Sequence, residues 1–152
     1  MLVAAPTGAG KTVIAEFAVY LCRERTAGKI FYTTPIKALS NQKYNELGAV
    51  WGYESVGILT GDTTINGEAP IVVMTTEVLR NMIYAQSSTL DELSFVVLDE
   101  VHYLADKFRG AVWEEVLIHL PQHVKTVSLS ATVSNAEEFG DWLKSVRGAT
   151  DV

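Results

Sequence analysis

A short glycine-containing loop, Ala5–Thr12, is the feature that most constrains how this chain can fold. The loop follows the apolar run Met1–Ala4 and opens a segment in which apolar residues recur at helical spacing, Ile14, Phe17, Ala18 and Leu21. Glycines let the backbone curl until successive N–H groups face one point, and the first turn of a helix adds a positive dipole end. A strand, loop and helix in this order therefore predict a binding site for phosphate groups.

The loop reads Ala5-Pro6-Thr7-Gly8-Ala9-Gly10-Lys11-Thr12 and matches the Walker A pattern, with Ala in place of the usual first Gly. In that pattern the lysine reaches the β- and γ-phosphates, and the hydroxyl of the next residue is a ligand of Mg²⁺. We therefore predict that residues 6–12 bind ATP with Mg²⁺, with Lys11 also catalytic and Thr12 on the metal. The alternative is a glycine-rich surface turn with a solvated lysine, which does not require the flanking strand and helix.

Two adjacent carboxylates follow another apolar run, Phe95–Leu98, which ends in Asp99-Glu100-Val101-His102. Asp99 is predicted to hold Mg²⁺ through a water molecule, because Mg²⁺ keeps much of its hydration shell in proteins. Glu100 is predicted to orient and polarise the water that attacks the γ-phosphate, so both carboxylates are candidate catalytic residues. By themselves, two carboxylates after a strand are an ordinary solvated pair. Downstream of a Walker A loop they predict ATP hydrolysis.

Strand and helix patterns alternate along the whole chain. Most of the strand candidates are continuously apolar, as expected for parallel strands covered on both faces. The sequence thus predicts an α/β fold with an open, mostly parallel sheet, helices on both faces, and ligands at the carboxyl ends of the strands. The predicted strands are Met1–Ala4, Ile30–Thr34, Val56–Thr60, Ile71–Thr75, Phe95–Leu98 and Thr126–Ser130. Besides the helix after the loop, helices are predicted over Ile36–Ala49 and Glu77–Ala85. Another is predicted from the apolar stripe Trp113, Val116, Leu117 and Leu120, and it ends at Pro121. The last is predicted from the stripe Phe139, Trp142, Leu143 and Val146, and it begins with a Ser134–Glu137 capping box.

Composition and charge limit the remaining possibilities. A length of 152 residues fits one domain, and no apolar run reaches the ~18 residues of a membrane span, so we expect a cytoplasmic protein without a membrane partner. The single Cys22 allows neither a disulfide framework nor a zinc site, and a buried apolar role is expected for it. A net charge of −6 disfavours a purely electrostatic nucleic-acid binder. It permits a local grip on phosphates by backbone N–H groups, hydroxyls and a few cations.

The acidic pair belongs to a longer stretch that resembles a known helicase box. It reads Asp99-Glu100-Val101-His102-Tyr103-Leu104-Ala105-Asp106, followed by Arg109-Gly110 and Val112-Trp113-Glu114-Glu115. This stretch is similar to the DExH box of superfamily 2 helicases, in particular the Ski-like branch and its HelY-type members, and the resemblance covers essentially the whole chain. It implies a three-layer, RecA-like P-loop NTPase domain that couples ATP hydrolysis to translocation along nucleic acid or to its unwinding. The implied partner is single-stranded or partly duplex nucleic acid, with RNA favoured over DNA.

The resemblance also implies residues that contact nucleic acid or couple it to the nucleotide. Thr34-Pro35-Ile36-Lys37-Ala38-Leu39 resembles motif Ia, in which the Thr34 hydroxyl, N–H groups and Lys37 would touch phosphates. Thr60-Gly61-Asp62 resembles a turn that grips the same backbone, and Thr75-Thr76-Glu77, with Arg80 one turn later, resembles motif Ib at a helix start. Ser130-Ala131-Thr132 resembles motif III, which with His102 would couple the nucleotide state to the nucleic-acid grip. Taken singly, each of these is also an ordinary turn, strand end or helix cap.

The resemblance sets expectations about the extent of the chain. Residues 1–152 correspond to the first motor domain, without upstream residues that contact adenine and without a second motor domain. That second domain supplies an arginine finger, which contributes ~10³–10⁵ in rate, so residues 1–152 alone are expected to hydrolyse ATP poorly. Two alternatives stay open. One is another P-loop enzyme, a class that lacks the acidic box followed by Ser-Ala-Thr, and the other is an ATP-gated nucleic-acid clamp, which has no need of Glu100.

Overall fold

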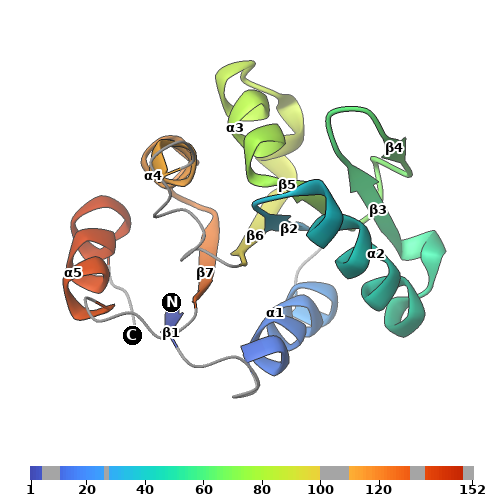
Figure 1. Ribbon diagram of the computed structural model, residues 1–152, viewed down its shortest axis with the longest axis horizontal. Helices are drawn as coiled ribbons and strands as arrows, with labels where there is room; N and C mark the ends of the chain where they lie inside the picture. Colours follow the sequence, from blue (N-terminus) through green and yellow to red (C-terminus); the bar gives the residue numbers. More distant parts are fainter. Residues whose placement is uncertain (5–10, 26–27, 100–109, 131–135, 149–152) are drawn as a thin grey trace.

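The computed structural model describes residues 1–4, 11–25, 28–99, 110–130 and 136–148, which form one sheet between two layers of helices (Figure 1). The sheet has seven strands in the order β1-β7-β6-β2-β5-β3-β4. Every neighbouring pair is parallel except β3 and β4, which are antiparallel. The strands are β1 (Leu2–Ala4), β2 (Lys29–Thr34), β3 (Val56–Leu59), β4 (Thr64–Ile65), β5 (Ile71–Thr75), β6 (Leu93–Leu98) and β7 (Lys125–Ser130).

Helices cover both faces of this sheet (Figure 1). Two of them, α1 and α2, lie on one face, and α3, α4 and α5 lie on the other. The helices are α1 (Lys11–Arg25), α2 (Lys37–Trp51), α3 (Thr76–Tyr84), α4 (Gly110–His119) and α5 (Ala136–Arg147), with single 3-10 turns at η1 (Tyr53–Ser55) and η2 (Ser88–Glu92). The predicted three-layer α/β fold is confirmed.

Two apolar clusters, one on each face of the sheet, hold the layers together. Strand β2 shows how, because its side chains alternate between the clusters. Phe31 belongs to the cluster that contains Val116 and Leu117 of α4, whereas Tyr32 belongs to the cluster that contains Val19 of α1. All β2 residues after Lys29 are buried. A strand covered on both faces in this way has no solvent-facing side, which is why Ile30, Phe31 and Tyr32 follow one another directly instead of alternating with charged residues.

The predicted elements agree closely with the structure. Each predicted strand forms, and its ends differ from the prediction by two residues at most. The stripe on α4 is also confirmed, since Val116, Leu117 and Leu120 are buried and the helix ends before Pro121. Strand β4 was not predicted, because its two residues are exposed and form no apolar pattern. The Ser134 capping box lies outside the described residues. No helix of the described part is long and apolar enough to cross a membrane.

The buried face of α1 is rotated about the helix axis from the apolar stripe that the sequence predicts. Ala15, Ala18, Val19 and Cys22 are all 4% exposed or less. Of the predicted stripe, Ala18 is buried and Ile14 packs partly buried against the same cluster. Phe17, by contrast, is 57% exposed. The buried stripe consists of small side chains, which let the helix lie close against the sheet. The larger residues of the predicted stripe line a groove of about 500 Å³ beside the helix. Burial of Cys22 confirms its predicted apolar role.

Candidate functional site

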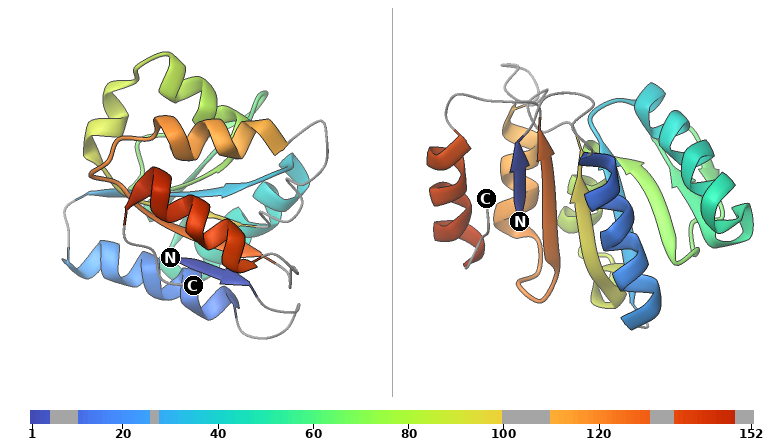
Figure 2. Two further views of the ribbon diagram at one scale, coloured as in Figure 1. Left: turned by 90° about the vertical axis from the view of Figure 1, so that its left-hand side faces the viewer. Right: turned by 90° about the horizontal axis from the view of Figure 1, so that it is seen from below.

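The described residues of the predicted site come after parallel strands, whose carboxyl ends lie at one edge of the sheet (Figure 2). Strands β1, β2, β5, β6 and β7 are parallel to one another, so their carboxyl ends share this edge. Helices α1, α2 and α3 begin there as well, at Lys11, Lys37 and Thr76. The first N–H groups of each helix have no partner within the helix. The fold therefore brings several donor-rich helix starts to the edge at which open α/β sheets bind ligands.

Much of the predicted nucleotide site lies outside the described residues, and those roles stay predictions. This applies to Pro6, Thr7, Gly8, Ala9, Gly10, Glu100, His102 and Thr132, and to the side chains of Lys11, Thr12 and Ser130. The strands that lead to them are described. Strand β7 lies between β1 and β6, with Ser130 beside Ala4 and Ser128 beside Leu98. The motif III strand thus adjoins both strands of the nucleotide site, as the sequence predicts.

Asp99, the predicted Mg²⁺ residue, sits at the carboxyl end of β6 and is held from the neighbouring strand β2. The Tyr32 hydroxyl donates a hydrogen bond of 2.6 Å to Oδ2 of Asp99, and the Asp99 N–H donates one of 2.9 Å to the Thr33 carbonyl. Tyr32 is 2% exposed. The sequence reasoning missed Tyr32, whose only signal was a polar-tipped aromatic residue inside an apolar strand. Its contact with Asp99 depends on β2 lying beside β6, which no local pattern reveals.

A second side chain, Lys43 of α2, lies against the same tyrosine. The Lys43 ammonium lies 5.1 Å from the centroid of the Tyr32 ring, within the range of a cation–π contact. It also forms a 2.8 Å ion pair with Glu46. The hydrogen bond from Lys43 holds the pKa of Glu46 below its ordinary value. Lys43 thus connects α2, the helix of motif Ia, to the tyrosine that holds Asp99.

Thr34, predicted to touch phosphates through its hydroxyl, uses that hydroxyl inside the fold. The residue is 1% exposed, and its hydroxyl donates a 3.0 Å hydrogen bond to the Ile36 carbonyl. It also lies 2.6 Å from the hydroxyl oxygen of Ser40. These bonds fix the turn that contains Pro35 and leads into α2. A phosphate contact through the Thr34 hydroxyl would require it to leave these partners.

The motif Ib segment opens α3, as the sequence predicts. Thr75 caps the helix by accepting a 3.4 Å hydrogen bond from the Val78 N–H. The buried Thr76 hydroxyl donates to the Thr34 carbonyl at 3.2 Å, which ties this segment to motif Ia. Glu77 lies 3.7 Å from the Arg80 guanidinium. The Arg80 Nε atom is buried and has no hydrogen-bond partner among the described residues.

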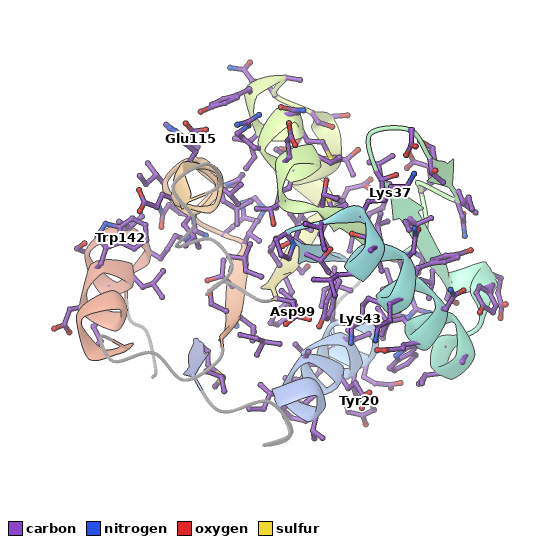
Figure 3. All side chains as sticks on the ribbon, viewed as in Figure 1. Tyr20, Lys37, Lys43, Asp99, Glu115 and Trp142 are labelled. Atoms are coloured by element: carbon purple, nitrogen blue, oxygen red, sulfur yellow. The ribbon has the colours of Figure 1, made fainter. Side chains whose placement is uncertain are left out.

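Lys37 and the turn after β3 meet at the same edge (Figure 3). The Lys37 ammonium lies 2.6 Å from Oδ2 of Asp62, and the Thr60 hydroxyl donates to Oδ1 of Asp62 at 3.1 Å. The hydrogen bond from Lys37 lowers the pKa of Asp62, with a smaller contribution from Thr60. Gly61 has open space where a Cβ would stand, so its backbone is accessible to a ligand. The structure thus joins two predicted nucleic-acid segments through Asp62, the last residue of the predicted Thr60-Gly61-Asp62 turn.

Comparison with known proteins identifies the family. The profile described as "DEAD/DEAH box helicase" matches residues 1–139. The chain belongs to the DEAD/DEAH box helicase family. This helicase domain is 64% identical over 152 residues to "Probable helicase HelY" of Mycobacterium leprae, a match that covers 100% of this chain and 16% of that relative. It is 50% identical over 143 residues to "Antiviral helicase SKI2" of Saccharomyces cerevisiae, covering 94% of this chain and 11% of that relative. The predicted Ski-like, HelY-type resemblance is confirmed.

Solved structures show the same fold. The Mycobacterium smegmatis helicase Lhr, whose structure has bound ssDNA and AMP-PNP, superposes with a TM-score of 0.75 and 30% identity over 95% of this chain and 22% of that chain. The Pyrococcus furiosus Hef helicase domain has a TM-score of 0.75 and 21% identity over 99% of this chain and 33% of that chain, which shows the shared fold. Family membership makes this helicase domain an ATP-binding domain. The chain spans about a sixth of the curated relatives' length or less.

Proposed function

We propose that this chain is the first motor domain of an ATP-dependent helicase that couples ATP hydrolysis to movement along nucleic acid or to its unwinding. One observation supports the proposal most directly. Asp99 stands at the carboxyl end of β6 and is bonded to β2, the strand that continues into motif Ia. The residue proposed for the nucleotide is therefore hydrogen-bonded to the strand that leads into the segment proposed for nucleic acid. A rigid strand with hydrogen bonds to both segments is a structural element that can carry energetic coupling between two sites.

The nucleotide half of the proposed site uses four side chains with separate roles. Lys11 binds the β- and γ-phosphates, and Thr12 and Asp99 hold Mg²⁺, which supplies charge neutralisation on the phosphates when bound. Asp99 suits this role because its carboxylate is half-buried at a strand end and is already oriented by a hydrogen bond. A hydroxyl and a carboxylate are oxygen ligands of the kind that Mg²⁺ prefers. Glu100 orients the attacking water and accepts its proton.

The nucleic-acid half lies over the ends of β2, β3 and β5. Lys37, the Thr60–Gly61 turn and the start of α3 at Thr76 supply a cation and backbone donors for phosphates. Pro35, Glu77 and Arg80 complete the surface, and the buried Thr34 stabilises it from within. His102, Ser130 and Thr132 couple it to the nucleotide. RNA is the favoured partner, because the chain resembles the Ski-like branch and is 49% identical over 158 residues to an Arabidopsis thaliana protein named an ATP-dependent RNA helicase. The ssDNA in the Lhr structure is the observation that favours DNA as the second candidate.

A second motor domain completes this proposal. The relatives are about six times longer than this chain or more, which leaves room for such a domain. It supplies the arginine finger and the other half of the nucleic-acid track, and residues 1–152 alone hydrolyse ATP slowly without it. The whole protein acts in the cytoplasm. The clamp alternative is not favoured, because the relatives in the comparison are named helicases.

The test is the ATPase rate of the protein that carries this domain together with a second motor domain, with and without single-stranded RNA or DNA, at stated salt. Stimulation by RNA supports an RNA helicase. Stimulation mainly by DNA supports a helicase whose substrate is DNA instead of RNA. ATP hydrolysis that responds to neither nucleic acid contradicts the helicase activity and leaves an ATPase.

A further inference from the structure

We propose that Tyr32 is a positioning residue for nucleotide binding: its hydroxyl fixes the Asp99 carboxylate in the orientation that Mg²⁺-ATP requires. The inference rests on the proposed function, in which Asp99 holds Mg²⁺. Tyr32 itself touches neither metal nor nucleotide and acts through Asp99. It belongs to none of the motifs that the sequence indicated.

The geometry of the contact supports this role. An O–H···O distance of 2.6 Å is short, as expected when a hydroxyl donates to an ionised carboxylate. The Tyr32 ring is 2% exposed and lies on a central strand, so the hydroxyl has little freedom to move. The Asp99 N–H also bonds to β2, at the Thr33 carbonyl. Strand β2 therefore holds both the backbone and the side chain of Asp99.

A fixed carboxylate matters here because Mg²⁺ demands near-octahedral geometry, so the water through which Asp99 is predicted to hold the ion must lie at a defined position. Asp99 is the first residue of the acidic box and directly follows the last residue of β6, Leu98. A side chain in that place reaches a defined rotamer only through support from neighbouring residues. The Tyr32 hydroxyl supplies that support, and Lys43 over the ring restrains the tyrosine in turn.

The competing explanation is that Tyr32 only fills the core. Its ring does pack in the cluster beneath α1 and α2, together with Val19 and Leu47. The hydroxyl and the ring are separable, however, because Tyr32→Phe removes the donor and keeps the ring. Tyr44→Phe is the matched control. Tyr44 packs against the same cluster from α2 and lies edge-on to Tyr53 at a ring-centroid distance of 5.5 Å.

The experiment measures binding of a fluorescent ATP analogue to the full chain, across a series of Mg²⁺ concentrations and in EDTA. For Tyr32→Phe we expect the Mg²⁺ concentration for half-maximal binding to rise roughly tenfold, the order of one lost hydrogen bond to a charged group. Affinity in EDTA should stay at the wild-type value. Tyr44→Phe should leave both unchanged. Circular dichroism and the unfolding midpoint establish that each variant is folded under the assay conditions.

Three outcomes overturn the inference. An unchanged Mg²⁺ requirement in folded Tyr32→Phe means that the hydroxyl does not position Asp99. An equal loss of affinity with Mg²⁺ and in EDTA means that Tyr32 acts on the fold and not on the metal. If the wild-type chain shows no Mg²⁺-dependent nucleotide binding while folded, the proposed nucleotide site itself fails, and the role of Tyr32 fails with it.

Discussion

The two halves of the functional edge use their polar side chains in different ways. Over β2, β3 and β5, the hydroxyls of Thr34, Thr75 and Thr76 bond to atoms of the domain itself, and Lys37 is paired with Asp62. Over β6, the described polar group is one carboxylate, Asp99, which β2 holds at the edge. The first half is a scaffold that offers mainly backbone groups. The second offers one described carboxylate, which we propose acts on the nucleotide.

This difference has a physical reason. Nucleic acid is an extended chain of phosphates that many weak contacts can hold, so backbone N–H groups on a rigid frame suffice. Hydrolysis of a phosphate bond needs a few charged groups at defined positions. Substitutions in the two halves should therefore change different properties: turnover in one half, and stability or nucleic-acid binding in the other. The following predictions test this, from the largest expected effect to the smallest.

Glu100→Gln should give the largest effect. Loss of the general base is expected to lower the ATPase rate by ~10²–10⁴, while ATP binding stays largely intact. The rate is measured in the protein that carries this domain and a second motor domain, and affinity by titration with a fluorescent ATP analogue. Glu114→Gln, an exposed carboxylate on α4, is the matched control. Normal turnover by Glu100→Gln would show that the general base is a different residue.

Thr34→Val should weaken the scaffold and not the chemistry. The change leaves the buried Ser40 hydroxyl without the oxygen that lies 2.6 Å from it and removes the bond to the Ile36 carbonyl. Loss of a buried partner of this kind costs roughly 1–3 kcal/mol of unfolding free energy, measured by urea denaturation. Thr64→Val on the exposed strand β4 should change stability by less than about 0.5 kcal/mol. Equal effects of the two variants would contradict the inference that the Thr34 hydroxyl stabilises the turn into α2.

Asp62→Asn should strengthen nucleic-acid binding. Asparagine keeps an acceptor for Thr60 but removes the charge that lies 2.6 Å from the Lys37 ammonium, which leaves the lysine available to a phosphate. We expect binding to tighten a few-fold at low salt and the slope of log K against log[salt] to steepen by about 0.7 for a single strand. The readout is fluorescence anisotropy of labelled single-stranded RNA over a salt series.

The control for Asp62→Asn is Glu68→Gln. Glu68 pairs with Lys29 at 3.1 Å, at the opposite edge of the sheet where β2 begins, so its loss should leave the salt slope unchanged. Weaker binding by Asp62→Asn would mean that Asp62 holds Lys37 in a productive position. An unchanged slope would mean that Lys37 does not contact phosphate.

The smallest effect concerns pH. The hydrogen bond from Lys43 holds the pKa of folded Glu46 below its value in the unfolded chain. The ion pair therefore stabilises the fold above the unfolded pKa of ~4.3, and this contribution disappears as the pH falls through the lower folded pKa. Glu46→Gln should flatten the decline of unfolding free energy below pH 5 by well under about 1 kcal/mol, because the carboxylate is partly exposed. A steeper decline of unfolding free energy in the variant would mean that ionised Glu46 destabilises the fold.

Most of the fold could be predicted from the sequence because its signals are local. Continuously apolar runs identify buried parallel strands, and glycines followed by Lys-Thr identify the turn from strand to helix. The carboxyl edge as the ligand side follows from the same pattern, since every predicted motif comes directly after a strand. Helix α1 forms as its spacing predicts, but the centre of its buried face differs from the predicted stripe. Several apolar stripes coexist on that helix. The small residues form its buried face, because they allow close packing against the sheet.

The motifs, their order along the chain and the edge at which they meet were thus determined by the sequence itself. Only the tertiary structure decided that β2 lies between β5 and β6, and with that the bond from Tyr32 to Asp99. It likewise decided that Lys37 meets Asp62, 25 residues away along the chain. Strand order and side-chain pairing depend on long-range packing between segments, which leaves no periodic signal in the residues that take part.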